Sequence, residues 1–219
     1  MNMISKRSML FLLGNLLNMN TVAAQNNQAP KAFPANPAID RQGEKWVAIT
    51  KVKKPWYAFR SLVVKKFVGS MPEYAAIPGL LFKAYAFTAH APYFGGIYLW
   101  DDKISAQNWF NPTWFARVLK TYKTPGVVLY FKVTGVQTLQ TLYATKGDYY
   151  SSLSMGDAAL PNDTKGLLRV YWVENEAGES GHICLWASEK AAKAYFKTVK
   201  VEPEYFDTPV LLWETKSAQ

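Results

Sequence analysis

The chain has very little cysteine and histidine, and this scarcity removes several kinds of site. Among 219 residues there is one cysteine, Cys184, and there are two histidines, His90 and His182. A lone cysteine cannot form an intrachain disulfide, so packing alone must stabilise the fold. The sequence has no paired-histidine helix motif for zinc, no cysteine pair, no phosphate-binding glycine loop and no Gly-x-Ser-x-Gly motif. We therefore expect no metal site and no conventional nucleotide site.

The apolar run near the start of the chain is too short to cross a bilayer, which needs about 20 residues. Residues 1–24 have the pattern of a secretory signal peptide: Lys6 and Arg7, then the apolar segment 9–17, then the small residues 22–24. We expect cleavage before Gln25 and secretion across the inner membrane to a periplasmic or extracellular location. No stable membrane insertion is expected after signal removal.

Composition separates a leader from the folded part. Residues 25–45 are rich in Asn, Gln, Ala and Pro and have no apolar period, which is typical of a flexible leader. The net charge is +9, or +7 without Lys6 and Arg7 (9 − 2), and such a balance favours anionic partners. The lysines are scattered, apart from clusters at 51–54 and 65–66. Because no recognition motif is present, we expect no nucleic-acid partner.

One pattern occurs twice, in residues 79–110 and 166–196. Residues 95–100 (GGIYLW) recur as 181–186 (GHICLW) at an offset of 86 (181 − 95), and 79–81 (GLL) recur as 166–168 at an offset of 87 (166 − 79). Solenoid repeats are shorter, at about 20–50 residues. The pattern indicates a duplicated half-domain, with a first half at 46–125 and a second at 126–215, in which each sheet can cover the other.

Apolar periodicity predicts the elements of each half. The first half has predicted strands at 46–52, 80–87 and 97–100 and helices at 55–69, 102–110 and 112–122; the second has strands at 127–133, 167–173, 181–186 and 210–214 and helices at 136–144 and 188–197. A tandem βαββαβ pair needs one more strand. Either one strand is shared between the halves, or the missing strand is a short one near 149–153 that the apolar pattern does not reveal. The glycines at 95, 96 and 181 are expected in hairpin connections.

Two segments carry a resemblance to a known family. Residues 166–176 (GLLRVYWVENE) and 178–186 (GESGHICLW) resemble the YdhR-like family of small bacterial monooxygenase-like proteins, which are dimeric α+β barrels related to the antibiotic-biosynthesis monooxygenases. The first copy keeps the family's lysine as Lys83 but has Phe82 and Tyr85 where the family has Trp. The second copy keeps Trp172 but has Val170 at the lysine position.

This resemblance implies a fold, an activity and an assembly. The fold is α+β, with two ferredoxin-like halves whose antiparallel sheets pack face to face within one chain. The activity is a cofactor-independent oxygenation of an aromatic or polyketide-like compound, in which the substrate itself activates oxygen. The expected assembly is a monomer, as a pseudo-dimer, or a weak homodimer.

Large aromatic and a few polar side chains lie on adjacent predicted strands and form the candidate site. Alternation places Lys83 and Tyr85 on one face, and Tyr98 and Trp100 on one face of the next strand. Such a face can line an apolar small-molecule pocket. The candidate catalytic residues are Lys83, to orient an anionic or phenolic oxygen, and His182, whose ordinary pKa is near neutrality. The candidate ligand-binding residues are Tyr85, Tyr98, Trp100, Trp172 and Trp186.

The residues alone leave three functions open. The chain can be an oxygenase, a binding module that holds an apolar or aromatic small molecule, or a structural protein with a filled core. In the last case the aromatic rings only pack, Lys83 reaches solvent through its flexible stem, and His182 is a structural residue.

Overall fold

Eight antiparallel strands form a closed barrel in the part of the chain that the computed structural model describes, residues 44–140, 146–156 and 164–213. Around the barrel the order is β1-β3-β2-β8-β5-β7-β6-β4, and β4 pairs back with β1. The fold class is therefore α+β, as predicted. The strands are β1 (Trp46–Lys53), β2 (Leu80–Thr88), β3 (Tyr93–Trp100), β4 (Val127–Thr138), β5 (Lys146–Met155), β6 (Leu167–Asn175), β7 (Ser180–Trp186) and β8 (Glu204–Trp213).

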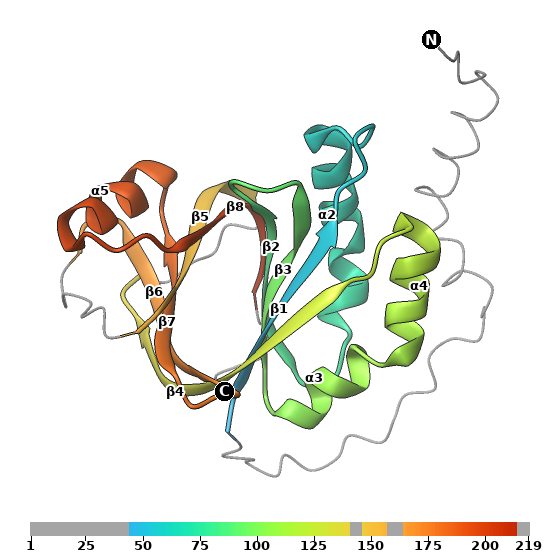
Figure 1. Ribbon diagram of the computed structural model, residues 1–219, viewed down its shortest axis with the longest axis horizontal. Helices are drawn as coiled ribbons and strands as arrows, with labels where there is room; N and C mark the ends of the chain where they lie inside the picture. The colour runs from blue at the N-terminus through green and yellow to red at the C-terminus, as the bar shows by residue number, and fades with distance from the viewer. Residues whose placement is uncertain (1–43, 141–145, 157–163, 214–219) are drawn as a thin grey trace. The chain divides into compact units, whose positions relative to one another are not determined.

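Four helices of the described region cover the outside of this barrel. They are α2 (Arg60–Ala75), α3 (Lys103–Trp109), α4 (Pro112–Tyr122) and α5 (Glu189–Val199). Helices α2, α3 and α4 lie on one side of the barrel and α5 on the other (Figure 1). Side chains cap three helix starts: Asp102, Asn111 and Ser188 each accept a hydrogen bond from the N–H three residues later.

The two sheets that the sequence predicts as face-to-face layers are joined at both edges. Strand β2 pairs with β8, and β4 pairs with β6, so the sheet runs without interruption around the barrel. On either side of these two joints the strand order is β4-β1-β3-β2 and β8-β5-β7-β6. In each set, the strand that comes fourth in the chain lies at one end, followed by the first, the third and the second.

Strand β5 is the strand that the sequence pattern lacked, so no strand is shared between the sets. It pairs with β7 and β8 through residues 146–155, which include the segment near 149–153. The predicted helix at 136–144 is wrong at its start, because β4 continues to Thr138 and pairs there with β6. The rest of that predicted helix lies largely outside the described residues.

Two glycines at matching places of the repeated sequence pattern have similar conformations. Gly79 and Gly166 both have positive φ, 81° and 84°, which glycine adopts without steric cost. Their carbonyl oxygens accept hydrogen bonds from the N–H groups of Asp101 and Ala187, at 2.9 Å and 2.8 Å. The glycines at 95 and 96 lie inside β3 and the glycine at 181 lies inside β7, rather than in hairpin connections as predicted.

The barrel interior is filled by an apolar core to which all eight strands contribute. One cluster of buried apolar residues includes side chains from every strand, and in a closed barrel such a cluster can only lie inside. Its members include Ile49, Phe82, Leu99, Leu185 and Phe206. Alternate residues along the strands point outward. They form separate apolar clusters beneath α3 and α4, beneath α2, and beneath α5.

The predicted signal peptide at 1–24 and nearly all of the predicted leader at 25–45 lie outside the described residues. Among the residues that are described, no helix has the length and apolar character needed to span a bilayer.

Candidate functional site

Lys83 is buried on the outer face of β2, among three tyrosine rings. The residue is 2 % exposed. Its Nζ lies 2.9 Å from the ring centroid of Tyr74, 3.7 Å from that of Tyr85 and 4.8 Å from that of Tyr98. Tyr85 follows on the same strand, Tyr98 faces Lys83 across the β2–β3 ladder, and Tyr74 comes from α2. We call these four residues the lysine–tyrosine cluster.

Burial controls the protonation of this cluster. It lowers the pKa of the Lys83 amine well below its usual value, and the nearby charge of Glu73 opposes this shift. Burial also raises the pKa of the hydroxyls of Tyr74, Tyr85 and Tyr98. The surroundings thus favour a neutral amine beside protonated phenols. A buried lysine of this kind is able to accept a proton from a bound molecule.

Hydrogen bonds hold the Tyr85 ring in place. Its hydroxyl lies 3.1 Å from the Ser70 Oγ, and the Ser70 hydroxyl donates to the carbonyl oxygen of Phe67 at 2.9 Å. Because the single hydroxyl hydrogen of Ser70 is used there, the Tyr85 hydroxyl is the donor in the first bond. Helix α2 therefore orients Tyr85.

Tyr98 is fixed through a second set of contacts, from β1 and α2. Burial raises the pKa of its hydroxyl, and interactions with the side chains of Thr50 and Tyr74 oppose this rise. The Thr50 Oγ1 also accepts the backbone N–H of Gly96 at 3.0 Å, which ties β1 to β3 at this point. The rings of the cluster are therefore held by the barrel wall on one side and by α2 on the other.

Trp100 extends the cluster toward α3 as packed aromatic surface. Its ring stacks beside Tyr98 with centroids 6.3 Å apart, and both rings make T-shaped contacts with Phe110. Trp100 is fully buried, and its indole Nε1 has no hydrogen-bond partner among the described residues.

The other three predicted site residues lie under α5. His182 and Trp186 point outward from β7 and both contact the ring of Phe196, with centroids 6.3 Å and 5.9 Å away. Trp172 faces His182 across the β6–β7 ladder. The indole Nε1 of Trp186 donates to the Ser152 Oγ at 2.9 Å. The structure therefore brings Lys83, Tyr85, Tyr98 and Trp100 together and places His182, Trp172 and Trp186 in a separate group.

The group under α5 has its own polar atoms. Burial lowers the pKa of His182, so a neutral imidazole is favoured. His182 and Ser154 are partners across the β5–β7 ladder, and neither the Nε2 of His182 nor the Oγ of Ser154 has a hydrogen-bond partner among the described residues. Val170 occupies the position that corresponds to Lys83, so this group has no amine in that place.

The sequence analysis missed Tyr74, whose ring centroid is the closest of the three tyrosine centroids to the Lys83 amine. The predicted helix ended at Gly69, whereas α2 continues through Pro72 to Ala75. Pro72 is tolerated because it lies on the exposed face of the helix, where water can solvate the carbonyl that loses its partner. The spacing of Phe67 and Tyr74, seven residues, continues the buried face of the helix and was the available signal.

No family model matches the sequence, and no curated protein matches it, so the resemblance to the YdhR-like family stays a prediction. Solved structures do match. A protein of Fusobacterium nucleatum described as a putative monooxygenase aligns with 81 % of this chain and 97 % of its own, with 12 % identity and a TM-score of 0.52. At this identity the likeness concerns the fold alone.

Two further structures align with lower scores. One is a putative monooxygenase from Lactobacillus acidophilus, with 14 % identity, coverage of 77 % of this chain and 94 % of its own, and a TM-score of 0.45. The other is an anthrone oxidase-like protein, with 9 % identity, coverage of 81 % and 98 %, and a TM-score of 0.48. The structural neighbours are thus described as monooxygenase-like or oxidase-like proteins.

Proposed function

We propose that this protein is a monooxygenase-like enzyme that acts on an electron-rich aromatic compound at the lysine–tyrosine cluster, without a metal or an organic cofactor. The observation that carries the proposal is the fully buried Lys83 amine with three tyrosine rings within 5 Å of its Nζ. The fold shared with the Fusobacterium protein supports the same class of activity.

The chemistry that we propose begins with a proton transfer. The neutral Lys83 amine takes a proton from an acidic C–H or O–H group of the substrate, and the resulting anion gives its electrons to O₂. For a CH₂ group the overall change is R₂CH₂ + O₂ → R₂C=O + H₂O, so one oxygen atom enters the product and the other leaves as water. The Tyr98 hydroxyl is the donor for a substrate oxygen, Tyr85 stays bonded to Ser70 and packs its ring against the amine, and Trp100 supplies aromatic surface.

A second candidate function rests on the position of Tyr74. Its ring centroid is 2.9 Å from the Lys83 Nζ, where a bound aromatic ring would otherwise lie. In this candidate the barrel is a non-catalytic binding or structural protein, and Tyr74 permanently fills the place of a ligand. In the enzymatic candidate, the C-terminal part of α2 moves and carries Tyr74 away from the amine when substrate enters.

The proposal includes an origin for the fold. We infer that the barrel is a dimeric α+β barrel joined into one chain by duplication, with two ferredoxin-like halves and a monomeric pseudo-dimer as its assembly. The matching orders β4-β1-β3-β2 and β8-β5-β7-β6 and the matching conformations of Gly79 and Gly166 support this inference. The pattern of residues 1–24 supports the further proposal that the protein is exported.

We expect Lys83→Met to abolish most of the oxygenase activity. Oxygen uptake would be measured with anthrone and 1-naphthol as probe substrates, with wild-type protein and this variant side by side. Methionine keeps most of the side-chain length but has no basic nitrogen, so turnover should fall about 100-fold or more, the usual contribution of a general base. Wild-type activity should also decline as the pH falls and the Lys83 amine becomes protonated.

The control for this assay is Lys190→Met, because Lys190 is an exposed lysine on α5. Its rate should equal that of wild type. Equal rates for wild type and Lys83→Met, or no protein-dependent uptake with either probe, would contradict the enzymatic proposal and favour the non-catalytic one.

A further inference from the structure

The turn before α2 presents two large aromatic side chains to solvent. Trp56 is 85 % exposed and Phe59 is 74 % exposed, the highest values among the large hydrophobic residues described. The sequence predicts both residues on the buried stripe of a helix, but α2 begins only at Arg60. Single exposed apolar residues are common, whereas two bulky rings on one short turn form a patch of the kind that marks an interaction site.

This turn is held firmly, so the exposure of its rings does not come from a loose segment. Ala58, between the two aromatics, is 1 % exposed and packs with Val63 and Phe67. The N–H of Ala58 donates to the Pro55 carbonyl oxygen at 3.0 Å, and the Nζ of Lys54 donates to the Ala58 carbonyl oxygen at 2.9 Å. The backbone is therefore fixed in the conformation that directs Trp56 and Phe59 outward.

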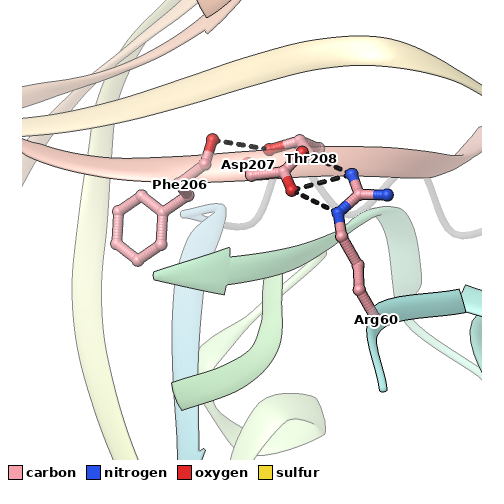
Figure 2. Close-up of polar contacts among 4 residues, drawn as sticks. All are labelled: Arg60, Phe206, Asp207 and Thr208. Atoms are coloured by element: carbon pink, nitrogen blue, oxygen red, sulfur yellow. Dashed lines mark hydrogen bonds and ion pairs between the residues drawn. The ribbon is translucent and has the colours of Figure 1, made fainter. Parts of the chain in front are cut away.

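The first residue of α2 adds a third attachment. The Arg60 guanidinium binds Asp207 of β8 through its Nε and Nη2 atoms, at 2.7–3.0 Å, and also lies 5.5 Å from the ring centroid of Phe87. Figure 2 shows this guanidinium beside the carboxylate on the strand that also carries Phe206 and Thr208. Because the charges of Arg60 and Asp207 neutralise each other, we do not count Arg60 among the basic residues available to a partner.

Lysines lie on both sides of the turn. Lys53 and Lys54 precede it, and Lys65 and Lys66 follow on the first turns of α2. None of these four lysines forms an ion pair with a residue that the structure describes. We call the two aromatics and these four lysines, which are neighbours in the sequence around this turn, the aromatic–basic patch.

We propose that the aromatic–basic patch docks the protein on the surface of an anionic lipid bilayer. Trp56 and Phe59 would enter the boundary between headgroups and acyl chains, where aromatic side chains are favoured, and the lysines would face the lipid phosphates. A projecting turn with two rings suits a bilayer, which needs no complementary shape, better than it suits single-stranded nucleic acid, which is held in a groove. This proposal is independent of the function proposed for the lysine–tyrosine cluster.

A label at position 56 tests the docking directly. The only cysteine, Cys184, is fully buried, so Trp56→Cys would provide the one accessible thiol for the environment-sensitive fluorophore NBD. With vesicles that contain phosphatidylglycerol, the emission should shift to the blue and increase. Vesicles of phosphatidylcholine alone should give a much smaller change, and added salt should reverse it. The matched control is the same label at Ile104→Cys, a residue of α3 that is 68 % exposed.

Vesicle sedimentation of the full chain gives a second readout. The double variant Trp56→Ala/Phe59→Ala should bind phosphatidylglycerol vesicles about tenfold more weakly than wild type, because it lacks the two apolar side chains that would be buried in the bilayer. Ile104→Ala should bind like wild type. Residues 1–24 are common to all variants, so the difference reports on the patch. Equal label responses at positions 56 and 104, unchanged sedimentation of the double variant, or a label response to oligothymidine rather than to vesicles would each overturn the proposal.

Discussion

Replacing Lys83 with methionine is expected to raise the free energy of unfolding at neutral pH, although the residue lies in a packed cluster. Burial lowers the pKa of the amine in the folded protein, whereas the unfolded chain has an ordinary lysine pKa of about 10.4. Between these two pKa values the unfolded state binds a proton that the folded state does not bind. The stability of the wild type therefore increases with pH across this window, and the variant lacks that contribution.

We expect the free energy of unfolding to increase by about 1–3 kcal/mol in Lys83→Met, which is the usual cost of burying a polar group. Urea unfolding of wild type and Lys83→Met at a series of pH values between neutrality and the ordinary lysine pKa would measure both the gain and the flatter pH dependence. Lys190→Met, at an exposed position of α5, should change the stability by less than about 0.5 kcal/mol. A loss of stability in Lys83→Met with an unchanged pH dependence would show that the amine is charged in the folded protein.

Gly95→Ala is expected to cause a large loss of stability. A Cβ at Gly95 would collide with the backbone carbonyl oxygen of Thr50 and would also lie 2.6 Å from its Oγ1. Because Thr50 belongs to β1, which pairs with β3 at this point, the collision is relieved only if the two strands separate. We expect a decrease of about 3 kcal/mol or more in the free energy of unfolding.

The contrasting variant is Gly69→Ala, in the interior of α2. An added Cβ there has no other atom within 4 Å, and alanine favours the helix. This variant should therefore be more stable than wild type by about 0.5–1 kcal/mol, in the same urea experiment. The steric account would fail if Gly95→Ala unfolded at the wild-type urea concentration.

Local pattern was sufficient for the strands that alternate cleanly and for the capped helices. The predicted helix 112–122 agrees with α4, and the predicted strand 46–52 agrees with β1 within one residue. Strand β5 was missed because Ser151, Ser152 and Ser154 give it no apolar alternation. Its burial depends on tertiary partners, such as the hydrogen bond of 3.0 Å between the hydroxyls of Ser151 and Thr208.

The start of the predicted helix at 136–144 failed for the opposite reason. Val136 and Leu139 have helical spacing, yet both are exposed to about two fifths of their surface, at 40 % and 39 %. The segment pairs with β6, whose residues are far away in the sequence, and this pairing outweighs the local preference. Phe115 and Leu119, which fit the apolar face of α4, are likewise partly exposed, at 37 % and 51 %.

For the site, strand alternation was enough to group Lys83 with Tyr85 and Tyr98 with Trp100. It could not show that the outward-facing residues of the two copies are covered by different helices. As a result, His182 was grouped with residues that lie under a different helix. Tyr74 was missed because its helix appeared to end at a glycine, and only the packing of α2 on the barrel places it over the amine.

The most direct test of the account is a pH titration of the Lys83 amine itself by NMR of protein with ¹³C-labelled lysine. The signal of Lys83 would be assigned as the one that is absent from Lys83→Met. We expect this signal to titrate at a clearly lower pH than the ordinary lysine pKa of about 10.4, because burial lowers the pKa of the Lys83 amine. A Lys83 signal that titrates at the ordinary lysine pKa would mean that the buried amine is charged at neutral pH and cannot serve as the base.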